Sequence, residues 1–135
     1  MKATYPSYGN NARTVRAEVE NVAVPMAGLT ELGTIPVGGC KRLMLQVAVT
    51  GQALDQFVIS ARTSPNAPFS ILYNQASHYI NPKGLLVGAS GDLTTLPAGS
   101  VGDLQMDVIG LHEVKIQVSS GNAAGSIVSA YGSAA

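Results

Sequence analysis

Residues 41–50 (KRLMLQVAVT) alternate between apolar side chains and polar or small ones, and this period of two constrains the fold more than any other feature. Leu43, Leu45, Val47 and Val49 fall on one side of the alternation. Successive side chains of a β-strand point to opposite faces, so the segment predicts a strand with one buried face. No window of about 11 residues or more shows a helical apolar period without Gly or Pro inside it, so we expect little helix.

The same alternation recurs along the chain between turn-forming Gly and Pro residues. It predicts strands over 14–24, 41–50, 56–63, 69–74, 103–109, 113–119 and 125–131, with shorter pieces near 29–35, 85–87 and 93. About seven to nine strands at a spacing of roughly 8–12 residues are typical of two packed sheets. The sequence therefore predicts an all-β fold, an antiparallel β-sandwich or a jelly roll, in which alternate residues enter one shared core.

Two local features add detail to this prediction. Asn21 interrupts the alternation of the first long strand, and Val22 and Val24 resume it in the other phase, as a bulge or a strand end would produce. Residues 110–112 (GLH) separate two strongly alternating segments and are short enough for a hairpin. We therefore expect 103–109 and 113–119 to pair with each other.

A chain of 135 residues has the usual size of one domain. We assign residues 14–135 to a single β-sandwich domain and 1–13, which are polar and without period, to an extended N-terminal arm. A frayed terminus is the simpler alternative, but the two tyrosines favour an arm that packs on a neighbouring subunit. The candidate assembly contacts are Tyr5, Tyr8 and Arg13.

Charge is sparse, and this argues against several classes of partner. Charged residues make up 12% of the chain, and eight basic residues offset eight acidic ones. The basic residues are scattered, whereas a nucleic-acid binder concentrates them, so no nucleic-acid partner is expected. Nothing resembles a membrane span or a secretory signal, which predicts cytosolic synthesis. The single cysteine, Cys40, is expected to be a buried side chain at the entrance of a strand.

The residues offer no catalytic constellation. His78 and His112 are the two histidines, and neither has metal-ligand neighbours at a useful spacing. Asp103 and Asp107 would lie about 13 Å apart on one strand face, too far for glycosidase chemistry. We therefore predict that the protein is not an enzyme and has no catalytic, cofactor or metal site. A carbohydrate-binding sandwich stays open, because exposed tyrosines can stack on sugars; its candidates are Tyr8, Tyr73, Tyr79 and Tyr131.

Three runs resemble small virion proteins of tailed bacteriophages, over about residues 36–131: PVGGCKRL to GQALD (36–55), GDLTTL (91–96) and DVIGLHEVKI (107–116). The resemblance lies in texture rather than in a diagnostic motif. It implies a structural protein of the virion, made in the bacterial cytoplasm, that decorates or cements the head shell. The implied partners are the major capsid protein, or another virion protein, and copies of itself in a dimer or trimer. A tail- or fibre-associated protein is the close competitor.

Overall fold

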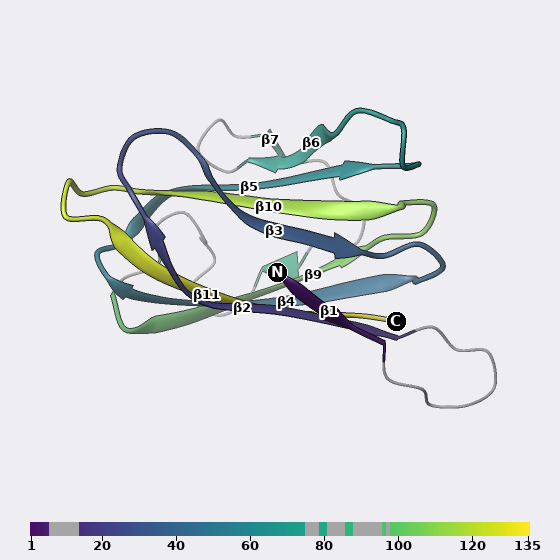
Figure 1. Cartoon of the computed structure of the whole chain (residues 1–135), viewed down its shortest axis with the longest axis horizontal. Coiled ribbons are helices and arrows are strands. Elements are labelled where there is room, and N and C mark those ends of the chain that lie inside the picture. The colour runs from purple at the N-terminus through teal and green to yellow at the C-terminus, as the bar shows by residue number, and fades with distance from the viewer. Residues whose placement is uncertain (6–13, 75–78, 81–85, 88–95, 97) are drawn as a thin grey trace.

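The computed structural model describes the chain except for residues 6–13, 75–78, 81–85, 88–95 and 97. The described residues form two antiparallel sheets without a helix, and Figure 1 shows the sheets as two stacked layers. One sheet has six strands, in the order β1 (Lys2–Thr4), β2 (Val15–Val24), β11 (Ser126–Ala134), β4 (Arg42–Gly51), β9 (Ser100–Asp107) and β8 (Leu86–Val87). The other has five, in the order β3 (Thr30–Pro36), β10 (Glu113–Ser120), β5 (Leu54–Arg62), β6 (Ser70–Asn74) and β7 (Tyr79–Ile80). The predicted all-β sandwich is confirmed.

The strand pairing is that of a jelly roll. Strand β2 pairs with β11, β3 with β10, β4 with β9 and β5 with β6, so the pairs nest like one long hairpin whose tip lies between β5 and β6. Rolling this hairpin places alternate pairs in opposite sheets, which gives the order β2–β11–β4–β9 in one and β3–β10–β5–β6 in the other. The short strands β1, β7 and β8 extend the edges.

A single apolar core fills the space between the sheets. The alternation at 41–50 behaves as predicted, since Leu43, Leu45, Val47 and Val49 are all buried. The two largest buried side chains, Phe57 and Tyr73, meet edge to face with ring centroids 6.2 Å apart. Such aromatic pairs contribute about 0.5–1.5 kcal/mol beyond the area that they bury.

The interruption at Asn21 is a β-bulge. Val19 lies opposite Ala130 and Val22 opposite Val128, so two residues of β2 face Ser129 alone. Asn21 takes a positive φ of 55°, and its N–H donates to Ser129 Oγ at 3.0 Å. The bulge returns Val24 to the core after the change of phase, as the sequence indicates.

The prediction that residues 110–112 close a hairpin between β9 and β10 is wrong. Strand β9 lies in the six-stranded sheet and β10 in the five-stranded one, so this connection crosses from one sheet to the other. It turns at Gly110, which has a φ of 83°, and the N–H of Leu111 donates to Val108 O at 3.0 Å. The two strands do not pair because each already has two partners, β4 and β8 for β9, and β3 and β5 for β10.

The N-terminal residues form a strand at the sheet edge. Lys2–Thr4 pair with β2, with Lys2 opposite Glu18 and Thr4 opposite Arg16. The segment predicted as an arm therefore begins with an edge strand, while residues 6–13 lie outside the described part of the chain. The predicted short piece at 85–87 corresponds to β8, and Leu93 is not among the described residues.

Candidate assembly surface

Of the three candidate contacts of the arm, Tyr5 is the one that lies among the described residues. Tyr5 directly follows β1 and is 58% exposed. Tyr8 and Arg13 lie outside the described residues. Tyr5 therefore stands beside the outer edge of the six-stranded sheet, and the surface next to it is the natural place to look for a partner.

The outer face of the six-stranded sheet carries an uncharged band at its centre. We call it the neutral stripe; it consists of the outward side chains of β11 and of β4 beyond Arg42, namely Met44, Gln46, Ala48, Thr50, Ile127, Ser129, Tyr131 and Ser133. Met44 is 48% exposed and Ile127 is 44% exposed, and Val101 of the neighbouring β9 adds an apolar side chain that is 55% exposed. Sequence reasoning missed this surface, because strands distant in the sequence build it.

Charged side chains border the neutral stripe on both sides. On the β9 side, Arg42 contacts Asp107 at 3.2 Å, and Asp103 lies opposite Gln46. On the β2 side, the exposed residues Arg16 and Glu18 lie beside Ser133 and Tyr131. An uncharged centre with a polar rim is the usual anatomy of a protein–protein interface.

Tyr131 occupies the middle of the stripe. Its hydroxyl donates to Glu20 Oε1 at 3.1 Å, which ties the side chain to β2. Next to it, a shallow hollow of about 250 Å³ is lined by Met44, Leu45, Gln46, Asp103, Tyr131 and Ser133. An aromatic ring beside a carboxylate and an amide can also contact a sugar. Among the described residues, this hollow is therefore the one place that supports the carbohydrate-binding hypothesis.

The other three tyrosine candidates give the carbohydrate-binding hypothesis less support. Tyr73, one of its four candidates, is fully buried in the core and cannot stack on a ligand. Tyr8 and the side chain of Tyr79 lie outside the described residues. Tyr131 is therefore the only one of the four that the described structure places on the surface.

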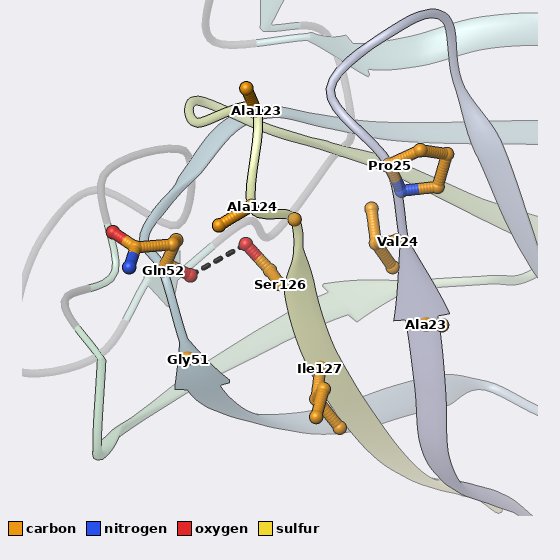
Figure 2. A pocket seen from close by; sticks show the side chains of 10 residues that line it. Ala23, Val24, Pro25, Gly51, Gln52, Ala123, Ala124, Ser126 and Ile127 are labelled. Atoms are coloured by element: carbon orange, nitrogen blue, oxygen red, sulfur yellow. Dashed lines mark hydrogen bonds between the residues drawn. The ribbon is translucent and has the colours of Figure 1, made fainter.

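A groove opens at one end of the sandwich, where the β10–β11 turn approaches the ends of β2 and β4 (Figure 2). It has a volume of about 510 Å³, and its lining residues are uncharged: Ala23, Val24, Pro25, Gly51, Gln52, Ala123, Ala124, Gly125, Ser126 and Ile127. Because Ile127 belongs to both, the groove continues the neutral stripe around the end of the sheet.

Buried serines support the wall of this groove. Ser126 is 2% exposed, and its hydroxyl donates to Gln52 O at 2.5 Å (Figure 2). A second hydrogen bond joins Ser126 Oγ to Ser120 Oγ at 2.8 Å. The adjacent hydroxyl of Ser119 donates to the Asp55 carboxylate. These bonds connect the β4–β5 turn to the β10–β11 turn, and we assign them a structural role.

The outer face of the five-stranded sheet differs from the neutral stripe because it carries charged side chains that contact an aromatic ring. Arg62 forms an ion pair with Glu113, and its guanidinium lies 4.7 Å from the centre of the Phe69 ring. Lys115 Nζ lies 4.4 Å from the centre of the same ring. These contacts tie Arg62 to Glu113 and place both Arg62 and Lys115 against the Phe69 ring.

The described residues bring no catalytic group together. His112 lies in the loop that precedes β10, whereas Ser119 and Ser120 end that strand, so the length of β10 separates the histidine from the serine cluster. In the described part of the chain, no three His, Cys, Asp or Glu residues lie close enough to hold a metal ion. His78 is outside that part.

Cys40 is 3% exposed, as predicted. No helix among the described residues is long and apolar enough to cross a membrane.

Comparisons with known proteins identify the fold but no family. No family model matches the chain, and no curated protein matches its sequence. The solved structure of the SPBc2 prophage-derived protein YomS is similar over 90% of this chain and 93% of its own, with a TM-score of 0.52 and 13% identity. The K2 cleaved adhesin domain of Lys-gingipain (Kgp) matches 98% of this chain and 70% of its own, with a TM-score of 0.45 and 11% identity. The first likeness shows a shared fold; the second is too weak to support an argument.

Proposed function

We propose that the protein is a non-enzymatic structural protein of a bacteriophage particle, a decoration or cement protein that binds the head shell through the neutral stripe. The observation that carries the proposal is the stripe itself, an uncharged sheet surface with exposed Met44 and Ile127 and a charged rim. Burying such a surface against a partner costs little, since no unpaired charge has to leave water.

Three further observations support this proposal. Jelly rolls are recurrent in viral capsid domains, although a fold alone does not determine function. The similar YomS structure is described as prophage-derived. The three runs that resemble phage virion proteins point the same way. The expected partners are the major capsid protein and further copies of this chain, within a virion assembled in the bacterial cytoplasm.

The proposal predicts the content of the particle. Quantitative mass spectrometry of purified virions should find the chain in many copies, in a fixed ratio to the major capsid protein. A ratio similar to that of tail proteins would move it to the tail or fibre, the competing location. Absence from purified virions would end the proposal.

Charge variants test which face binds. Val101→Glu places a carboxylate beside the neutral stripe, and Ile71→Glu is its matched control on β6 of the other sheet, where Ile71 is 45% exposed. Both changes lie on exposed strand positions, so both variants should fold like the parent. In binding to particles that lack the protein, Val101→Glu should weaken affinity at least about tenfold, since like-charge or unpaired contacts cost several kcal/mol. Equal binding by the two variants would contradict the assignment of the face.

A carbohydrate-binding module is the second candidate, favoured by the hollow beside Tyr131. A glycan array would test it directly, with Tyr131→Ala as the variant. Binding that Tyr131→Ala abolishes would favour this candidate, and an array without any signal would remove it.

A further inference from the structure

Strand β1 is held by contacts that any copy of the protein can offer. Among the described strands it lies at the edge of its sheet and pairs with β2 alone, over three residues. On the outer face Lys2 lies opposite Glu18, a pair of opposite charge, and Thr4 Oγ1 donates to Arg16 O at 3.4 Å. All of these acceptor groups belong to β2 and therefore to the body of the sandwich.

The body of the sandwich also contains a packing site for Met1, next to Gly33. At Gly33 in β3, an added Cβ would lie 2.4 Å from Met1 Cβ and 2.9 Å from Met1 N, so only glycine leaves room for Met1. Gly33 has a φ of 142°, and the pairing of β3 with β10 shifts register at this point. The irregularity thus creates a notch, the space above Gly33, in which the partly buried Met1 packs against the core.

The connection between β1 and β2 is longer than this pairing requires. Thr4 lies opposite Arg16, and a hairpin joins such strands with about two to five residues. This chain has ten residues between Thr4 and Val15, numbered 5–14. Fully extended, ten residues reach about 35 Å. A domain of this size has a radius of gyration of roughly 14 Å, hence a diameter close to that reach.

From these three observations we propose that β1 is exchanged between copies: residues 1–4 of one copy pair with β2 of a neighbour, and Met1 fills the neighbour's notch at Gly33. In a closed assembly each copy donates one strand and receives one, so every contact of β1 is kept. The exchange must compete with the chain's own strand, whose effective concentration is on the order of mM. The inference rests on the self-association included in the proposed function, and the shell plays no part in it.

An exchanged strand also offers contacts that two packed sheet faces do not. A strand placed on the neighbour contributes main-chain hydrogen bonds to β2 and the buried contact of Met1 at Gly33.

Disulfide trapping tests the exchange in solution. One preparation carries Thr4→Cys and a second, of different mass, carries Arg16→Cys; both sites lie on the outer face and face each other across β1 and β2. Cβ atoms at such positions are about 5 Å apart, within the range of a disulfide. The natural thiol, Cys40, is buried. The two preparations are mixed at about 1 mM, unfolded and refolded together and oxidised. Mass spectrometry then measures the disulfide-linked heterodimer.

The matched control mixes Arg42→Cys with Asp107→Cys, which face each other across β4 and β9 inside the same sheet. Exchange predicts that on the order of a tenth of the chains or more form the heterodimer of Thr4→Cys with Arg16→Cys, against a near-zero background in the control. A double variant with both Thr4→Cys and Arg16→Cys in one chain shows that the pair can oxidise.

If the double variant oxidises within one chain while the mixture gives no more heterodimer than the control, the exchange is refuted. Because no phage particle is used, that result leaves the shell-binding proposal standing. Conversely, absence of the protein from virions would leave the exchange standing.

Discussion

Replacing Ser126 with alanine should destabilise the whole domain, although the change removes one oxygen atom. Ser126 is 2% exposed, and its hydroxyl donates to Gln52 O at 2.5 Å. It also shares a hydrogen bond of 2.8 Å with the fully buried Ser120. Alanine leaves the Gln52 carbonyl without this donor and Ser120 without this partner, in a wall of the groove where the β4–β5 and β10–β11 turns meet (Figure 2).

The size of the effect follows from the cost of an unsatisfied buried polar group, about 1–3 kcal/mol. Gln52 is exposed, so water can reach its carbonyl, and Ser120 keeps an alternative acceptor, Asn122 O at 3.3 Å; we therefore expect the cost of one such group, about 2 kcal/mol, rather than the sum of two. Unfolding entropy near 60 °C is about 2.1 cal/mol/K per residue, or roughly 280 cal/mol/K for 135 residues. The melting temperature should therefore fall by about 7 °C.

Urea unfolding followed by circular dichroism measures the free energy, and calorimetry measures the melting temperature. The matched control is Ser133→Ala, an exposed serine on the same strand, which should change stability by less than about 0.5 kcal/mol. The m-value should stay constant in both variants, because the surface exposed on unfolding is unchanged. Equal stabilities of the two variants would refute the structural role assigned to the Ser126 hydrogen bonds.

Two other positions give sharp predictions for stability. At Gly132, an added Cβ would lie 2.7 Å from Ile35 Cδ1, so Gly132→Ala should cost about 1–3 kcal/mol, and Ile35→Val in the same chain should recover part of that loss. Strict additivity in this double-mutant cycle, measured by urea unfolding, would contradict the contact. At Asn21, whose φ is 55°, Asn21→Val should be less stable than Asn21→Gly by about 1–2 kcal/mol, since a β-branched residue resists a positive φ. Thermal unfolding compares the two variants, and equal melting temperatures would be inconsistent with the bulge.

The sequence predicted the faces of the strands better than their partners. The alternation at 41–50 identified the buried side of β4, and the change of phase at Asn21 located the bulge. Alternation says which side chains enter the core, but both sheets share that core, so it cannot tell which sheet a strand joins. The connection at 110–112 shows this limit, because three residues can close a hairpin or cross between sheets.

The candidate surface could be predicted even less. Tyr5 lies beside the sheet edge and is exposed, and its role as an assembly contact stays a prediction. The neutral stripe joins β4 to β11, about 80 residues apart, and Met44 lies near Ser133 only because those strands pair. The pairing of Lys2–Thr4 with β2 was likewise beyond prediction, since three residues carry no periodic signal.

Cryo-electron microscopy of the virion tests the central claim, that the protein acts by binding the head shell through one face, most directly. The account predicts density for the sandwich on the shell, with the six-stranded sheet inward and the neutral stripe in contact with the major capsid protein. Ile71, on the five-stranded sheet, should then face away from the shell. Density that placed the five-stranded sheet against the shell would contradict the assigned surface, and a shell without this density would contradict the proposed function.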